Sequence, residues 1–143
     1  MTSERNKNAR RIVLWMLYAT DISKRSPQAV LASSLAIAEE FVPDAAQCWD
    51  LVTERVTGAY EQLDTLNAEI QALSPRWRLD RMAAVDRNLL RLGAAEILLR
   101  EIPPIITINA CIELAKLYGD KSTPAFVNGL LDQFCKNHAI PIN

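Results

Sequence analysis

The sequence contains few of the residues on which sheets, metal sites and phosphate-binding loops depend. Of its 143 residues, four are glycine and one, His138, is histidine. The scarcity of glycine leaves few signals for hairpin turns, and no glycine-rich loop for a phosphate is present. A zinc site needs about four sulfur or imidazole ligands, which one histidine and widely separated cysteines do not provide. We therefore expect helices rather than sheets, and neither a metal nor a cofactor.

Cysteines are also few, and their spacing does not match a C-x-x-C redox or metal-binding motif. Cys48, Cys111 and Cys135 are an odd number, each lies beside apolar residues, and no two form a C-x-x-C pair. Such cysteines are typical of buried, reduced thiols. The sequence therefore predicts a cytoplasmic protein.

Long hydrophobic runs are absent as well. No apolar stretch approaches the ~18 residues that cross a bilayer, so no membrane-spanning helix is expected. A basic start followed by IVLWMLYA at 12–19 resembles a signal peptide, but no small-residue cleavage site follows it. The same stretch carries an apolar stripe at helical spacing, formed by Ala9, Ile12, Val13, Met16 and Leu17. This pattern favours an amphipathic helix of the fold.

Half of the residues are hydrophobic, and at this length they are enough for one domain, predicted to span residues 1–143. The net charge of −1 excludes nucleic-acid binding through bulk charge alone, so any such binding needs a local patch. Charge is indeed unevenly distributed, at +3 in residues 1–11, −7 in 39–69 and +3 in 76–100. The sequence thus predicts separate basic and acidic surfaces.

Helical periodicity dominates the chain, which we predict to be an all-α helical bundle of about seven helices. The expected segments are residues 8–22, 27–40, 44–73, 75–82, 85–100, 107–118 and 125–137. The segment 44–73 has apolar residues in alternating steps of three and four, typical of a continuous helix that forms the spine of the bundle. A dimeric coiled coil would use the same stripe, although other amphipathic segments are available to cover it within one chain.

One apolar segment near the C-terminus, FVNGLLD at 126–132, contains the polar pair Asn128 and Gly129. Both residues are poor in a helix interior, so a reason other than helix propensity is needed. We favour close helix packing at Gly129, with Asn128 bonding buried backbone groups. The alternative is a surface that a ligand approaches.

Four segments together resemble the NusB family of bacterial transcription antitermination factors. They are NARRIVLWMLY at 8–18, VDRNLLRLGAAEILL at 85–99, INACIELAKLYG at 108–119 and FVNGLLD at 126–132. The resemblance implies a protein of two small helical sub-bundles. It also implies pairing with NusE, a small-subunit ribosomal protein, and binding to single-stranded boxA-type RNA. In this family the pair acts with the RNA polymerase elongation complex, notably on ribosomal RNA operons.

The resemblance implies RNA contacts at Lys7, Arg10 and Arg11 in the first helix and at Phe126 in the last. Lys121 is a weaker candidate for holding a phosphate at a helix N-terminus. A solvated basic end for the first helix and a core position for Phe126 remain alternatives.

The same family pattern places Tyr18 and Asp86 at the NusE contact. A core position for Tyr18 and a helix cap at Asp86 remain alternatives. Five further matching residues are interpreted chiefly as architecture: Asn109, Glu113, Lys116, Asn128 and Gly129.

The chain departs from the family pattern in ways that affect RNA binding. Ala125 stands where a lysine commonly precedes Phe-Val-Asn-Gly, which removes one phosphate contact, and Ala110 replaces a usual acid. Arg11 and Trp15, with Tyr18, could form an exposed basic and aromatic strip. Whether this strip compensates for Ala125 or serves self-association is left open by the sequence.

No serine or cysteine has a plausible histidine base nearby in sequence, and no carboxylate pair forms a recognisable catalytic motif. We therefore expect no enzyme. The alternative to the antitermination function is a protein-only helical adaptor or homodimer with weak or no RNA binding.

Overall fold

The structure, a computed structural model, describes residues 2–143, without the side chains of Thr2 and Ser3. Within these residues the fold is all-α, as predicted. The α-helices are α1 (Thr2–Ser23), α2 (Pro27–Phe41), α3 (Trp49–Glu61), α4 (Leu63–Leu73), α5 (Ala84–Leu99), α6 (Pro104–Tyr118) and α7 (Thr123–Asn137), and the 3₁₀ helices are η1 (Ala45–Cys48) and η2 (Leu79–Arg81). None of the helices described here is long and apolar enough to span a bilayer.

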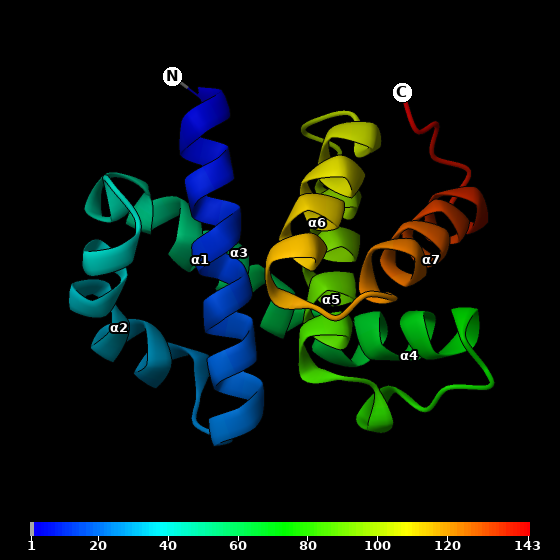
Figure 1. The fold of residues 1–143 in the computed structure, drawn as a ribbon, viewed down its shortest axis with the longest axis horizontal. Coiled ribbons are helices and arrows are strands. Elements are labelled where there is room, and N and C mark those ends of the chain that lie inside the picture. Colours follow the sequence, from blue (N-terminus) through cyan, green and yellow to red (C-terminus); the bar gives the residue numbers. More distant parts are fainter. Residues whose placement is uncertain (1) are drawn as a thin grey trace. The chain divides into compact units, whose positions relative to one another are not determined.

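The chain divides into two compact units, as the resemblance implies (Figure 1). The first unit ends at Glu61 and contains α1, α2, η1 and α3, with α1 packed against the other three. The second unit, Gln62–Asn143, contains α4 to α7 and η2. In this unit α6 packs against α5 and α7, and α4 lies against α5 and α7.

The prediction of one continuous helix over 44–73 is wrong. Asp44 adopts a left-handed conformation (φ 63°), residues 45–48 form a 3₁₀ turn, and Gln62 separates α3 from α4 with φ −116° and ψ 24°. The apolar stripe is therefore shared between two cores, because Val52 and Val56 are buried in the first unit while Leu66 and Ile70 are buried in the second. An unbroken heptad pattern shows that each turn faces a core, but not that all turns face the same one.

The apolar stripe predicted for the first helix is confirmed in α1. All five of its residues are buried: Ala9, Ile12, Val13, Met16 and Leu17. Because α1 is the helix that α2, η1 and α3 all contact, this stripe forms the centre of the first core. The stretch that resembles a signal peptide is thus part of the folded unit.

The core of the second unit is built around α5. Its buried residues include Leu89, Leu90, Ala94 and Ile97, and they meet Ile108 and Ala115 of α6 and Val127, Leu131 and Phe134 of α7. A buried arginine links α4 to α5, since Nε of Arg91 donates to Oδ1 of Asn67 (2.9 Å) and Nη1 donates to Oδ1 of Asn88 (3.0 Å). The three cysteines are buried and free, as predicted.

The predicted helix over 75–82 is also wrong. Ser74 ends α4 instead of starting a new helix, and only Leu79–Arg81 of the following segment is helical. The side chain of Gln71 explains this conformation. Its Nε2 donates to the carbonyl oxygens of Ser74 (3.1 Å) and Trp77 (2.9 Å), and its Oε1 accepts the N–H of Leu79 (2.7 Å). Backbone groups that a helix would pair internally are bonded by this one amide.

The favoured interpretation of Asn128 and Gly129 as packing residues is wrong. Both are exposed on α7, and a Cβ added at Gly129 would meet nothing within 4 Å. The close helix approach occurs at another glycine, Gly93 of α5. A Cβ there would lie 2.7 Å from Cδ1 of Leu131 and 3.3 Å from Sγ of Cys111.

We predict that Gly93→Ala lowers the free energy of unfolding by about 1–2 kcal/mol, because the added Cβ would force the buried Leu131 side chain to shift. The matched control is Gly58→Ala in α3, where a Cβ meets open space. This variant is expected to be more stable by about 0.5–1 kcal/mol, since alanine is the better helix former. Urea denaturation measures both. Equal effects of the two substitutions would contradict the assignment of Gly93 as a packing site.

Candidate functional site

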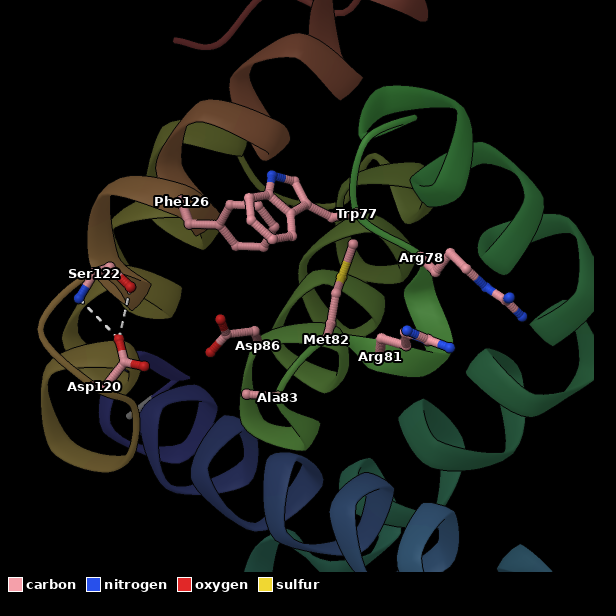
Figure 2. A pocket seen from close by; sticks show the side chains of 9 residues that line it. All are labelled: Trp77, Arg78, Arg81, Met82, Ala83, Asp86, Asp120, Ser122 and Phe126. Carbon is pink, nitrogen blue, oxygen red and sulfur yellow. Dashed lines mark hydrogen bonds between the residues drawn. The ribbon is translucent and has the colours of Figure 1, made fainter.

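The second unit has a pocket of about 420 Å³ at the end of α5 where Asp86 lies. Its walls come from the segment that follows α4, the first turn of α5, the loop between α6 and α7, and the first turn of α7 (Figure 2). The lining residues are Trp77, Arg78, Arg81, Met82, Ala83, Asp86, Asp120, Ser122 and Phe126. The pocket therefore combines aromatic, cationic and acidic groups.

Two aromatic side chains line this pocket from different elements. Trp77, on the segment held by Gln71, is 65% exposed, and Phe126 extends from the first turns of α7. Arg78 and Arg81 are exposed beside them, and Arg78 is paired with Asp80, its Nη2 lying 2.9 Å from Oδ2. Trp77 was not among the predicted site residues. The signal that could have indicated it is the sequence RWRLDR at 76–81, in which an aromatic residue lies between arginines.

The acidic wall of the pocket is a hydrogen-bonded cluster. Oγ1 of Thr123 donates to Oδ1 of Asp86 (2.8 Å), joining α7 to α5. Oδ1 of Asp120 accepts the N–H (2.8 Å) and the hydroxyl (2.7 Å) of Ser122. Burial, with a smaller contribution from the charge of Asp120, raises the pKa of Asp86. The hydrogen bonds from Ser122 lower the pKa of Asp120.

Gly119 fixes the position of this cluster. It follows α6, as predicted, but its φ of −91° needs no glycine. The requirement is steric, because a Cβ at Gly119 would lie 2.5 Å from Cβ of Thr123. The absence of a side chain at Gly119 therefore lets the buried Thr123 sit against the chain that precedes α7.

The predicted RNA-binding residues fall into both units. Phe126 lines the pocket of the second unit together with Asp86, a predicted NusE contact, whereas Lys121 is exposed in the loop before α7 and is not among the lining residues. Lys7, Arg10 and Arg11 belong to α1 in the first unit, where Lys7 is exposed but Arg10 is only 8% exposed. Arg10 thus offers much less surface to a ligand than its charge suggested.

The basic and aromatic strip predicted on α1 is formed in part. The guanidinium carbon of Arg11 lies 5.2 Å from the ring centroid of Trp15, in a cation–π arrangement. Trp15 is half-buried and also meets the ring of Phe41 edge-on, at 6.3 Å between centroids and 84° between planes. Tyr18 is 41% exposed, so the core interpretation of Tyr18 is wrong.

Three other residues of the family pattern lie on the surface of α6. Asn109, Glu113 and Lys116 are exposed, and Nζ of Lys116 lies 3.1 Å from Oε2 of Glu113. An exposed ion pair of this kind contributes little to stability. Together with Asn128 and Gly129, these residues form surface rather than core. No cluster of three or more potential metal ligands occurs in the part of the chain that the structure describes.

The fold and the pocket define an all-helical binding protein, and comparison with known proteins identifies its family. The model of the NusB family matches residues 7–136. A transcription antitermination protein NusB from Anaeromyxobacter dehalogenans is 40% identical over 133 residues, which cover 93% of this chain and 91% of that protein. The chain belongs to the NusB family.

Two solved structures are similar over nearly the whole chain. The structure of T. maritima NusB has a TM-score of 0.78 at 28% identity, and the match covers 95% of this chain and 92% of that one. A structure of the antitermination factors NusB and NusE in complex with double-stranded RNA has a TM-score of 0.81 at 26% identity, with 93% and 97% of the two chains covered.

We predict that Asp86→Asn raises the free energy of unfolding at pH 7 by up to about 1 kcal/mol, a modest gain because the group is only partly buried. Burial raises the pKa of Asp86 in the folded state, so the folded protein binds this proton more tightly than the unfolded chain does. The stability that Asp86 contributes at low pH is therefore lost as the pH rises through the raised pKa.

Urea denaturation at pH 7 and at a pH below the ordinary aspartate range tests this prediction. The difference between the Asp86→Asn variant and the unmodified protein should shrink at the lower pH. Asp80→Asn is the control, because Asp80 is exposed and paired with Arg78. A lower stability of Asp86→Asn at pH 7 would contradict the prediction.

Proposed function

We propose that the protein is a non-enzymatic transcription antitermination factor that pairs with NusE and binds boxA-type single-stranded RNA. In this proposal the complex acts on RNA polymerase elongation complexes in the cytoplasm and keeps transcription processive, notably in ribosomal RNA operons. Family membership and the similarity to a complex of NusB, NusE and double-stranded RNA support the pairing with NusE and the binding of RNA, and the single-stranded form of the RNA is part of the proposal. The observation in this chain that carries it is the pocket in which aromatic and cationic side chains adjoin a partly buried carboxylate.

The aromatic side of the pocket suits single-stranded RNA. Unpaired bases stack on aromatic and guanidinium planes, at about 1–3 kcal/mol for each base. Trp77 and Phe126 offer such planes, and Arg78 and Arg81 in the same lining are cations that we propose for phosphate contacts. Phe126 was a predicted RNA contact, and Trp77 is added to the proposal by its exposure and its place in the pocket.

The first unit contributes the second group of RNA contacts in this proposal. Lys7 offers an exposed charge, while Arg11 and Trp15 offer a stacked guanidinium and indole. We propose that this pair compensates for the lysine missing at Ala125. Arg10, although retained as a predicted contact, is expected to add less because it is largely buried.

The acidic side of the pocket and Tyr18 are proposed to contact NusE. Asp86 provides a carboxylate for a cationic side chain, and Tyr18 provides an exposed ring with a hydroxyl. Two modest surfaces that act together give an affinity that neither gives alone. Assembly, rather than catalysis, is thus the proposed mechanism.

We predict that Lys7→Ala combined with Arg11→Ala weakens binding of boxA RNA about three- to tenfold. The slope of log affinity against log salt should fall in magnitude by about 1–2, because fewer counterions are released when fewer phosphates are contacted. Pairing with NusE should be unchanged. Filter binding over a series of salt concentrations measures the slope, with Arg25→Ala as the control for an exposed cation of the same unit.

Scrambled RNA separates the proposed function from its alternative. If boxA RNA with NusE forms no tighter complex than scrambled RNA with NusE, the antitermination proposal fails and a protein-only adaptor or homodimer is the better description. The mass of the protein in solution, with and without NusE, then identifies the homodimer.

We predict that Trp77→Leu and Phe126→Leu each weaken boxA binding about tenfold, because leucine keeps apolar bulk but loses the stacking plane. The salt slope should be unchanged, since no charge is removed. Leu117→Ala, at an exposed apolar position on α6 outside the pocket lining, serves as the control. Unchanged RNA affinity in both aromatic variants would contradict the proposal that RNA binds in this pocket.

A further inference from the structure

The hydroxyl of Thr123 occupies a position between two carboxylates of the pocket. Its Oγ1 lies 2.8 Å from Oδ1 of Asp86 and 3.3 Å from Oδ1 of Asp120. The same oxygen accepts the backbone N–H of Asp120 at 3.0 Å. Thr123 therefore connects the first turn of α5 with the loop that precedes α7.

A threonine hydroxyl has one proton, so it donates to one carboxylate at a time. The N–H of Asp120 uses one lone pair of Oγ1, and the shorter distance favours donation to Asp86. Asp120 does not need this proton, because its Oδ1 already accepts the N–H and the hydroxyl of Ser122. The arrangement thus assigns the Thr123 proton to Asp86.

Packing holds the hydroxyl in this orientation. Thr123 is completely buried, and its side chain lies against the position where a Cβ of Gly119 would be. A β-branched side chain has few χ1 conformations, and burial reduces them further. The hydrogen bond that Asp86 accepts from Thr123 is therefore fixed by the fold and does not depend on a mobile side chain.

We propose that Thr123 and Asp120 are positioning residues for Asp86, which set the orientation and the charge of its carboxylate for a cationic side chain of the partner protein. This inference rests on the proposed function, in which Asp86 contacts NusE. It goes beyond that function by assigning roles to two residues that need not touch the partner themselves.

The surroundings of Asp86 act on its pKa in opposite directions. Burial raises the pKa of Asp86, the hydrogen bond from Thr123 lowers it, and the charge of Asp120 raises it by a smaller amount. Arg78 and Arg81 line the same pocket, but Arg78 is paired with Asp80, and the pKa of Asp86 reflects burial, Thr123 and Asp120 rather than these arginines. A cationic side chain of the partner would stabilise the Asp86 carboxylate. Partner binding is therefore linked to release of the Asp86 proton.

The test combines a titration of Asp86 with a binding measurement. NMR of the side-chain carboxyl carbon gives the pKa of Asp86 in the free protein, and calorimetry gives NusE affinity at several pH values. Four variants are compared: Thr123→Val, Thr123→Ser, Asp120→Asn and Asp86→Asn. Valine keeps the shape of threonine without the hydroxyl, and asparagine keeps the oxygen that accepts from Ser122.

We predict that Thr123→Val raises the pKa of Asp86 and weakens NusE binding about five- to tenfold at neutral pH, because a hydrogen bond to a charged group is lost. Thr123→Ser should restore both values. Asp120→Asn should lower the pKa of Asp86 and extend tight NusE binding to lower pH. For Asp86→Asn, NusE binding should be weaker at neutral pH and should lose most of its dependence on pH in the acid range.

Each failure has its own signature. An Asp86 pKa that is the same in Thr123→Val, Asp120→Asn and the unmodified protein would overturn the positioning proposal, whatever NusE does. Weaker NusE binding by Asp86→Asn but not by Thr123→Val would also overturn it, while leaving the proposed contact intact. NusE binding that does not respond to Asp86→Asn would overturn the contact itself, and with it the role assigned to Thr123. A folding defect in Thr123→Val is recognised by urea denaturation of the variant and the unmodified protein.

Discussion

The close approach of α5, α6 and α7 at Gly93 is the constraint on which the second unit depends. The lack of a side chain at Gly93 lets Leu131 and Cys111 pack against the backbone of α5. A densely packed core resists deformation and so supports the elements around it. The first turns of α5 and α7 both contribute to the wall of one pocket, and this frame determines that Asp86 and Phe126 meet there.

The pocket itself is built from the segments between helices. Gln71 bonds the backbone of residues 74–79, which prevents a helix there and leaves Trp77 exposed. Thr123 bonds the backbone of the loop before α7 in the same way, because its Oγ1 accepts the N–H of Asp120. The missing side chain of Gly119 leaves the space that the Thr123 side chain fills. In both places one polar side chain satisfies backbone groups that would otherwise need a helix. Rigid loops of this kind can present ligand-binding residues at little entropic cost.

The departures from the family pattern that the resemblance implies lie on α1, α6 and α7. Ala125 lacks the amino group commonly found before Phe-Val-Asn-Gly, whereas α1 has Arg11 over the ring of Trp15. Asn128 and Gly129 remain on an exposed face of α7, where packing does not require them. Packing within the fold therefore does not explain the presence of these two residues.

The sequence by itself determined the all-α class, most helix ends, the buried cysteines and the apolar stripe of α1, because each follows from local composition and the 3.6-residue period. The motifs also indicated Asp86 and Phe126. Tertiary structure decided the break at Gln62, since a heptad pattern does not reveal which core each turn faces. It also decided the exposure of Gly129 and the place of Trp77, which depends on a Gln71 side chain that bonds residues three to eight positions away. Such contacts depend on which groups the folded chain brings together, and local periodicity carries no information about them.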